Sequence, residues 1–334
     1  MARALLQKDP ASKDLVLDQL PVPKRQPNSN EHLIQVHAIA PCNGELLWPK
    51  NFPLPDPSIK YPVPGHDMAG TVVEAPESSP FQPGSEVYGR TRYSRTGAAR
   101  DYTISVTAEL ARRSQRLSWA ESAATALSAE SAWQALFIQA GLGSIESGLA
   151  KGKRILITGA SGGCGCWEVQ LASLAGAHVI GICGGQNVDL VKRLGARETI
   201  DYHTTDVAEW GQKAENKVDI VIDNIGGPSL ESAWWAAKGD GVIVSIAQPP
   251  ETARPLECEN FVKTLFFIMQ SSGAQLEQIT KLIDEGKCKP LVDSVWSLED
   301  HKKAFDKADS GHASGKVVID IIGSVRNAKR ELAA

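Results

Sequence analysis

The sequence predicts an α/β fold in which a doubly wound parallel sheet is joined to a second, β-rich domain. The middle of the chain alternates short apolar runs with helical stretches, whereas both ends place β-like runs between turn-forming residues. Alternation of apolar strands with helices is typical of a parallel sheet that is covered on both faces. The 334 residues are enough for two domains that each bury a core.

Residues 1–125 are predicted to form the β-rich domain. They contain β-like runs at 33–36, 70–73 and 102–106, which are separated by stretches rich in proline and glycine. Short runs of this kind between turn residues indicate strands joined by irregular loops.

Residues 126–269 are predicted to form the domain with the parallel sheet. The expected strands are 154–157, 178–182, 218–222 and 241–245, and helical stretches such as 189–194 and 230–237 lie between them. Residues 270–334 return to the texture of the first domain and are expected to complete it. They contain expected helices around 275–285 and 298–308 and an expected strand at 316–322.

Composition excludes several classes of function. The formal net charge is −4 and no five lysines and arginines cluster, so a nucleic-acid partner is not expected. Charged side chains at positions 3, 8 and 9 interrupt the N-terminus, and no apolar run approaches a membrane span. We therefore predict a cytoplasmic protein without a membrane partner. The six cysteines form no C-x-x-C pair and are expected to be reduced.

A glycine-rich stretch follows the strand expected at 154–157 and precedes a helical stretch at 167–175. It reads Thr158-Gly-Ala-Ser-Gly-Gly-Cys-Gly165, with glycines at 159, 162 and 165. Such a turn lets the backbone approach a pyrophosphate, whose charge is met by N–H groups and the helix dipole. A tight structural turn is the alternative. The strand–turn–helix context and the alternation that follows favour a dinucleotide-binding Rossmann unit.

The choice of dinucleotide depends on the end of the second expected strand. There the sequence is Gly181-Ile-Cys-Gly-Gly-Gln-Asn187, with no Asp or Glu to meet a ribose 2′-OH or to repel a 2′-phosphate. This favours NADPH over NADH, although the turn has no Arg or Lys and Lys192 is expected inside the next helix. Tyr202 follows the third strand and either closes over the same ribose or packs as a half-buried side chain.

Five stretches in order along the chain resemble the medium-chain dehydrogenase/reductase superfamily. They are 61–70 (YPVPGHDMAG), 81–89 (FQPGSEVYG), 194–202 (LGARETIDY), 223–227 (DNIGG) and 314–318 (SGKVV), together with the glycine-rich stretch. Within the superfamily the sequence resembles the quinone oxidoreductase and trans-acting enoyl reductase branch. The resemblance implies a GroES-like catalytic domain built from both chain ends and a Rossmann domain between them. It also implies an active site in the cleft where the nicotinamide reaches the first domain.

The resemblance also assigns cofactor-binding residues by position. These are Gly159, Ser161, Gly162, Gly163, Cys164, Gly165, Gly184, Gly185, Gln186, Asn187, Tyr202, Ser245, Ile246, Ala247 and Phe266. Ser131 matches a Thr or Ser that lies near the nicotinamide. Three departures stand against the pattern: Ala40-Pro-Cys-Asn-Gly replaces Asn-Pro-x-Asp, Gly-Ser-Glu-Val replaces Gly-Asp-x-Val, and Gln186 replaces a basic residue.

Zinc alcohol dehydrogenases of the superfamily bind catalytic metal with a Cys, the His of Gly-His-Glu and a later Cys or acidic residue. Here His66 is present in Gly-His-Asp, but the first-ligand position is Ala40 and residues 125–131 contain no cysteine. Residues 90–116, where a structural zinc lobe would lie, also lack cysteine. Because catalytic zinc needs three protein ligands, we predict no metal. Pairing of Cys42 and His66 with an unexpected acidic ligand remains the alternative.

Without a metal, hydride from NADPH is expected to reach a conjugated carbonyl, a quinone or an enone, whose enolate charge hydrogen-bond donors can hold. His66 is the candidate proton donor, and a pocket-lining histidine is the favoured alternative. Asn43, Tyr61, Tyr93 and Ser131 are candidates to hydrogen-bond the substrate, with ordinary packing favoured for the two tyrosines.

Two other functions remain open on the sequence. One is an enoyl reductase that serves a polyketide synthase in trans, and the other is an NADPH-binding sensor or structural protein without turnover. The expected partner is a small-molecule substrate, and a second copy of the chain or a biosynthetic synthase is a further possibility.

Overall fold

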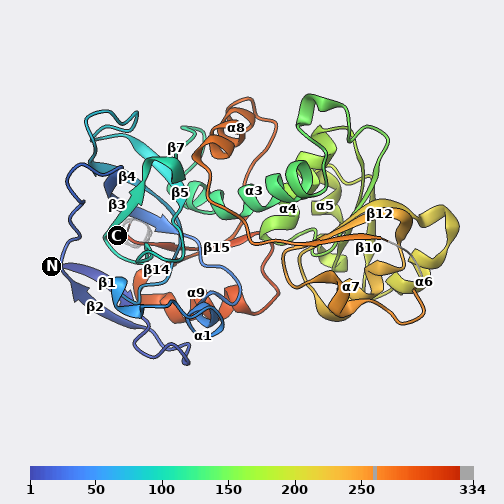
Figure 1. The fold of residues 1–334 in the computed structure, drawn as a ribbon, viewed down its shortest axis with the longest axis horizontal. Helices are drawn as coiled ribbons and strands as arrows, with labels where there is room; N and C mark the ends of the chain where they lie inside the picture. The colour runs from blue at the N-terminus through green and yellow to red at the C-terminus, as the bar shows by residue number, and fades with distance from the viewer. Residues whose placement is uncertain (259–261, 324–334) are drawn as a thin grey trace, which may run out of the picture. The chain divides into compact units, whose positions relative to one another are not determined.

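The computed structural model describes residues 1–258 and 262–323. The chain divides into two compact units, of which the first joins Met1–Leu127 with Ser271–Ala334 and the second is Ser128–Gln270. Figure 1 shows the helices and strands of both units. Among the described residues, no helix has the length and apolar character that crossing a membrane requires.

The first unit is built on a mixed sheet that combines strands from both ends of the chain. Its order is β14-β15-β3-β4-β5-β7, and β6 pairs with β3. The bounds are β3 Glu31–Ile39, β4 Asp67–Glu74, β5 Glu86–Arg90, β6 Tyr102–Val106, β7 Leu110–Arg112, β14 Val292–Ser297 and β15 Lys316–Asp320. Ile319 of β15 lies opposite Ile39 of β3, so a C-terminal strand extends the sheet that the N-terminal residues begin.

Apolar side chains hold this sheet in place. Val317 and Ile319 on β15 are buried, and they join a core cluster with Ile34 and Ile39 of β3 and Met68 of β4. Burial of side chains of this size stabilises the fold by roughly 1.5–3 kcal/mol each. The two ends of the chain are therefore joined by a shared core as well as by backbone pairing.

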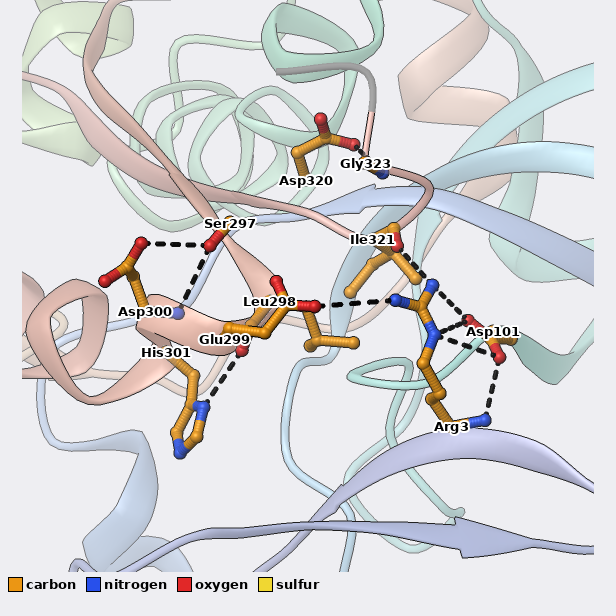
Figure 2. A network of polar contacts seen from close by, with 10 residues as sticks. All are labelled: Arg3, Asp101, Ser297, Leu298, Glu299, Asp300, His301, Asp320, Ile321 and Gly323. Atoms are coloured by element: carbon orange, nitrogen blue, oxygen red, sulfur yellow. Dashed lines mark hydrogen bonds and ion pairs between the residues drawn. The ribbon is translucent and has the colours of Figure 1, made fainter. Parts of the chain in front are cut away.

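A short hairpin, β1 (Ala2–Leu6) and β2 (Val16–Leu20), starts the chain, and Arg3 ties it to the C-terminal part. Arg3 Nη2 donates to Asp101 Oδ1 at 2.8 Å and to the Ile321 carbonyl at 2.7 Å. Figure 2 shows the guanidinium between these two residues. Gly323 donates its N–H to Asp320 Oδ1 at 3.2 Å, near the end of the described chain.

The first unit has four helices, and two of them, α2 and α8, are capped by side chains. They are α1 Trp48–Asn51, α2 Trp119–Ala123, α8 Gly273–Asp284 and α9 His301–Asp309. Ser118 and Glu121 form a capping box at α2, because each side chain bonds the other residue's backbone N–H. The Ser272 side chain caps α8 by accepting the N–H of Gln275. A further helix, α3 (Ala126–Trp133), contains the division between the units.

The second unit is built on a parallel sheet with the order β10-β9-β8-β11-β12-β13. The strands are β8 Arg154–Ile157, β9 His178–Cys183, β10 Glu198–Asp201, β11 Val218–Asp223, β12 Ala237–Ser245 and β13 Lys263–Phe266. The chain starts in the middle at β8, proceeds outward to β10, and then returns to β11 on the other side of β8. The carboxyl ends of β8 and β11 therefore flank the point where the strand order reverses, which is where open α/β sheets bind ligands.

Helices connect the parallel strands. They are α4 Gly163–Leu174, α5 Val188–Arg193, α6 Val207–Gln212 and α7 Gly227–Trp234. Figure 1 shows α4 and α5 on one side of the sheet and α7 on the other. Trp234 of α7 is fully buried together with Leu156 and Val221 of the sheet, which gives this face a large apolar core.

The structure confirms the predicted fold class, a Rossmann parallel sheet together with a β-rich domain. Individual elements differ from the sequence-based expectation. The helix predicted at 230–237 ends at Trp234 because β12 already begins at Ala237. The helix predicted at 167–175 begins at Gly163, since the last glycines of the turn are helical, and the helix expected at 298–308 starts with a 3₁₀ turn, Leu298–Asp300.

Candidate functional site

The glycine-rich turn joins β8 to α4, and two of its glycines are needed for steric reasons. Gly159 has φ +59°, a left-handed conformation that glycine adopts without strain. A Cβ on Gly165 would lie 2.2 Å from the Gly159 carbonyl oxygen, so only glycine lets α4 begin so close to the turn. Gly162 is less restricted from within, because its Cβ would meet the Gly159 oxygen at 3.2 Å. A contact of 3.2 Å with a backbone oxygen is still tight, so the protein itself disfavours a larger residue at position 162.

The N-terminus of α4 has the properties of an anion site. Gly162 is the N-cap residue, and no side chain caps the helix there. The first N–H groups of a 12-residue helix carry the positive end of its dipole, which favours a phosphate group. The predicted pyrophosphate site, Gly159 to Gly165, is thus built from a strand, a glycine turn and a helix N-terminus.

A buried carboxylate, Asp223, supports the glycine-rich turn through hydrogen bonds to residues at the ends of neighbouring strands. Asp223 is the last residue of β11 and is fully buried. It accepts hydrogen bonds from Thr158 Oγ1 at 2.8 Å, from Ser245 Oγ at 2.8 Å and from the Gly226 N–H at 3.0 Å. These bonds join the carboxyl ends of β8, β11 and β12. Ser245 is a predicted cofactor contact, but its hydroxyl donates its hydrogen bond to Asp223.

Glu168 on α4 is a second buried carboxyl beneath the turn. Asn224 Nδ2 donates to Glu168 Oε2 at 2.7 Å and to the Thr158 carbonyl at 2.9 Å. Burial raises the pKa of Glu168 to about 8, and the neighbouring charge of Asp223 acts in the same direction. Glu168 is therefore largely protonated at neutral pH. Sequence reasoning missed Asp223 and Glu168 as supports, although Asp223 begins the 223–227 motif.

The predicted cofactor segments meet at one edge of the parallel sheet. In register, Ile157 of β8 lies beside Gly181 of β9, and Ser245 of β12 lies beside Phe266 of β13. Carboxyl ends of parallel strands share one edge, so the segments after each strand gather there. Ile246 and Ala247 follow β12 directly, and the Ile246 N–H donates to the Asp223 carbonyl at 3.0 Å. Phe266 ends β13 with 40% of its surface exposed.

Residues 184–187, which follow β9, contact the glycine-rich turn directly. Asn187 Nδ2 donates to Ser161 Oγ at 3.1 Å, so two predicted cofactor residues from different turns are hydrogen-bonded to each other. Gly185 and Gln186 are exposed. Tyr202 follows β10, is 52% exposed and lies against His203 with ring centroids 4.2 Å apart. This exposure leaves one face of Tyr202 accessible to a ribose.

The structure adds a carboxylate that the sequence pattern did not reveal at this turn. Asp201, the last residue of β10, places its carboxylate beside Gly185. An ideal Cβ on Gly185 would lie 2.5 Å from Asp201 Oδ2. Residues 183–187 contain no acidic side chain of their own, but Asp201 brings one from the neighbouring strand. Residues 183–187 therefore lack a carboxylate in the sequence, but the folded chain places one beside them.

In the first unit, His66 lies at the centre of an aromatic cluster. It directly precedes β4, is 2% exposed, and its Nδ1 is 3.0 Å from Thr91 Oγ1. Its ring is stacked on Trp48 with centroids 5.9 Å apart and meets Tyr93 edge-on at 5.8 Å. Burial, and then the charges of Lys60 and Arg90, lower the His66 pKa well below its usual value. The ring is therefore neutral at pH 7.

Lys60 is a member of this cluster that sequence reasoning missed, as is Trp48. The Lys60 Nζ donates to the Tyr93 carbonyl at 2.5 Å and lies 3.9 Å from the centroid of the Tyr93 ring. Burial lowers the Lys60 pKa to about 8, so the side chain remains mostly protonated at neutral pH. Only proximity in the fold reveals this, because position 60 has no pattern of its own.

The other residues that the sequence suggested as substrate contacts, Asn43, Tyr61 and Ser131, have different surroundings. Asn43 is exposed, and Tyr61 is 49% exposed, with its N–H bonded to Thr96 Oγ1 at 3.1 Å. Ser131 lies on α3, in the second unit, and is 3% exposed. The structure thus brings His66 and Tyr93 together, whereas the substrate contacts proposed for Asn43, Tyr61 and Ser131 stay predictions.

Cys42, the cysteine nearest to His66 in the sequence, is the residue that a metal site with His66 would require. The ammonium of Lys316 lies 3.3 Å from Cys42 Sγ and 3.5 Å from Asp67 Oδ2. Burial raises the pKa of the Cys42 thiol to about 11. Within residues 1–258 and 262–323, no three His, Cys, Asp or Glu side chains are grouped so that they could hold a metal ion. The residues present therefore do not fit a zinc site.

The carboxylate of Glu45 also accepts hydrogen bonds from the protein with both of its oxygens. It accepts the Cys42 N–H at 2.9 Å and the Gly65 N–H at 2.6 Å. Both its oxygens thus brace the loop that carries Cys42 and the segment before His66. An acidic ligand for a metal on Cys42 and His66 is not supplied by Glu45 in this geometry.

Comparison with known proteins agrees with this architecture. Residues 28–114 match the family model of the alcohol dehydrogenase GroES-like domain, and residues 194–319 match that of the zinc-binding dehydrogenases. A relative from Arthroderma benhamiae, named "Probable zinc-binding oxidoreductase, mitochondrial", is 46% identical over 96% of this chain and 97% of its own length. The "Chloroplast envelope quinone oxidoreductase homolog" of Arabidopsis thaliana is 30% identical over 91% of this chain and 94% of its own.

Solved structures show the same fold. The quinone oxidoreductase from Coxiella burnetii superimposes with a TM-score of 0.79 at 24% identity, covering 96% of this chain and 99% of that one. The predicted resemblance and the GroES-like domain are confirmed by these matches. The relatives from Arthroderma benhamiae and Arabidopsis thaliana are 46% and 30% identical over more than nine tenths of this chain. The chain therefore belongs to the medium-chain dehydrogenase/reductase superfamily of oxidoreductases.

Proposed function

We propose that the protein is an NADPH-dependent reductase that delivers hydride to a conjugated carbonyl compound, a quinone or an enone, without a catalytic zinc. The observation that carries the proposal is the buried ammonium of Lys316 beside Cys42 and Asp67. A divalent ion there would be repelled by the ammonium, and its thiol ligand would have to ionise although burial raises the Cys42 pKa to about 11. The name of one relative and that of one matching family model include zinc, and the position of Lys316 argues against a zinc site of that kind in this chain.

Bound NADPH supplies the hydride, and the protein's task is to hold the charge that develops on the substrate. A conjugated acceptor suits this site because the charge moves to an enolate oxygen, which hydrogen-bond donors stabilise. The protonated Lys60 is a donor of this kind beside Tyr93, and the neutral ring of His66 lines the same cluster with Trp48. The aromatic rings give a planar substrate a surface to stack on.

The proposed cofactor site comprises the glycine-rich turn, residues 184–187, Tyr202, residues 245–247 and Phe266. Support for it comes from the uncapped N-terminus of α4 and from the bond between Asn187 and Ser161. NADPH is favoured because residues 183–187 carry no acidic side chain of their own, and the carboxylate that Asp201 brings from β10 narrows this preference without reversing it. Calorimetric titration of purified protein tests this choice, and tighter binding of NADH than of NADPH would contradict it.

Turnover tests the reaction itself. NADPH oxidation, followed at 340 nm with a panel of quinones and enones, should proceed without added zinc. Fast reduction of acyl thioesters with slow reduction of free quinones would instead support a trans-acting enoyl reductase. Binding of NADPH without oxidation in any assay would support the sensor hypothesis. A cytoplasmic location and a dimer or synthase partner stay predictions, and the names of several relatives include mitochondrial or chloroplast locations.

A further inference from the structure

The adenosine end of the proposed cofactor site differs from the usual Rossmann arrangement. In that arrangement an Asp or Glu about 20 residues after the glycine motif, at the end of the second strand, accepts the ribose 2′-OH. Here the second strand is β9, and Gly184 and Gly185 follow it. The position where a side-chain carboxylate is expected is therefore occupied by glycine.

The neighbouring strand supplies a carboxylate to the same place. Asp201 ends β10 and pairs in parallel register with Cys183, the last residue of β9. Its Oδ2 fills the space that a Cβ on Gly185 would need, since the two would lie 2.5 Å apart. The carboxylate thus lies directly against the backbone at the ribose end of the proposed site.

The charge of Asp201 is fixed by its other contacts. The His203 N–H and the ring Nδ1 of His203 both lie 3.0 Å from Asp201 Oδ1. These bonds, the His203 backbone N–H first among them, hold the Asp201 pKa below its usual value, so the group is ionised at neutral pH. The lysine and arginine that follow residues 184–187 most closely in the sequence, Lys192 and Arg193, lie in the last turn of α5, at the end remote from that turn.

We infer that Asp201 is a specificity-determining residue for the 2′-position of the cofactor, where its ionised carboxylate lies against Gly185 and repels the charge of a 2′-phosphate. The inference rests on the proposed NADPH-dependent reduction. It implies that the protein prefers NADPH only narrowly, because a carboxylate from β10 opposes the phosphate that residues 184–187 otherwise admit. NADH should therefore remain a usable cofactor.

The variant Asp201→Asn tests this directly, because asparagine keeps the shape and an oxygen that can accept the His203 N–H. Removing one unit of like charge a few ångströms from a 2′-phosphate should tighten NADPH binding by about tenfold, while the Kd for NADH changes less than about twofold. Both dissociation constants are measured by calorimetry on the full chain, and the KM values are measured with one quinone. The matched control is Asp240→Asn, an exposed aspartate near the amino end of β12, at the opposite edge of the sheet. This control should leave both constants unchanged.

A second measurement uses the unaltered protein and does not depend on the variant folding. Adenosine 2′,5′-bisphosphate and adenosine 5′-monophosphate should displace bound NADPH with similar affinities, within about tenfold. A preference for the bisphosphate of a hundredfold or more would overturn the role of Asp201. An unchanged NADPH-to-NADH ratio in folded Asp201→Asn would overturn it as well. Failure of the unaltered protein to bind either dinucleotide would overturn the proposed function itself and this inference with it.

Discussion

Replacing Glu168 by glutamine should stabilise the second unit at neutral pH. Glu168 is fully buried under the glycine-rich turn, and desolvation raises its pKa to about 8. The charge of Asp223 raises the pKa further, whereas the hydrogen bond from Asn224 opposes the shift. Glutamine keeps an oxygen for the Asn224 amide and cannot ionise.

The sign and size of the effect follow from proton linkage. In the unfolded chain this carboxyl titrates near 4.5, whereas in the folded chain it titrates near 8. Between these values the folded state holds a proton that the unfolded state has lost. The contribution of Glu168 to stability is therefore fully present below pH 4.5 and decreases as the pH rises toward 8. At pH 7 the loss is about 3 kcal/mol, which Glu168→Gln should largely restore.

Hydrogen exchange of the α4 amides provides a readout local to the second unit, and urea unfolding provides a global one. Both are measured at pH 5 and pH 7.5 for the unaltered protein, for Glu168→Gln and for the control Glu215→Gln, whose side chain is exposed. We expect Glu168→Gln alone to reduce the difference between the two pH values. If Glu168→Gln followed the unaltered protein within about 0.5 kcal/mol at both pH values, the buried, protonated carboxyl would be refuted.

Three other changes have defined outcomes. Gly162→Val should abolish binding of both NADPH and NADH in calorimetry while circular dichroism stays native, because its side chain would block the approach of the pyrophosphate; retained binding would contradict the site. His66→Ala should leave kcat within a few-fold and the NADPH affinity unchanged, because the buried ring is already neutral; a loss of roughly 10²-fold would instead make His66 the proton donor. Elemental analysis should find no stoichiometric zinc, and activity should persist in chelator; about one zinc per chain with activity lost on its removal would restore the metal hypothesis.

Strands of the second unit were the most predictable elements. Continuous apolar runs place β8 and β9 almost as the structure has them, since a strand buried on both faces leaves an uninterrupted hydrophobic signal. The edge strand β13 was not predicted. Three of its four residues, Lys263, Thr264 and Phe266, are polar or exposed, so its pattern does not differ from that of a loop.

The sequence predicts those parts of the candidate site whose residues are close together along the chain. The glycine-rich turn is such a feature, because strand, turn and helix are consecutive. Asp201 and Gly185 are brought together only by the parallel pairing of β10 with β9, and Lys60 reaches Tyr93 only through a loop. A spacing rule for an acidic residue about 20 positions after the glycines cannot find a carboxylate that arrives from the next strand.

The position of the Lys316 ammonium beside Cys42 and Asp67 bears on the proposed substrate class. The Lys316 ammonium balances the charge of Asp67, as a cation must in a buried site. A metal ion would in addition accept a carbonyl oxygen as a ligand and draw electron density from it. The described contacts of Lys316 are to Cys42 and Asp67, which are protein groups.

In the proposed reaction, activation comes from the substrate and from hydrogen-bond donors. Conjugation lowers the demand on the protein, because the charge reaches the oxygen through the π-system after hydride adds at the β-carbon. In the first unit, the donor beside the Tyr93 ring is Lys60, and burial lowers its pKa to about 8. An ammonium with a lowered pKa shares its proton with an enolate oxygen more readily than a fully solvated lysine does. For the proposed reaction, the first unit thus favours an acceptor that is already polarised, and Trp48 and Tyr93 favour one that is flat.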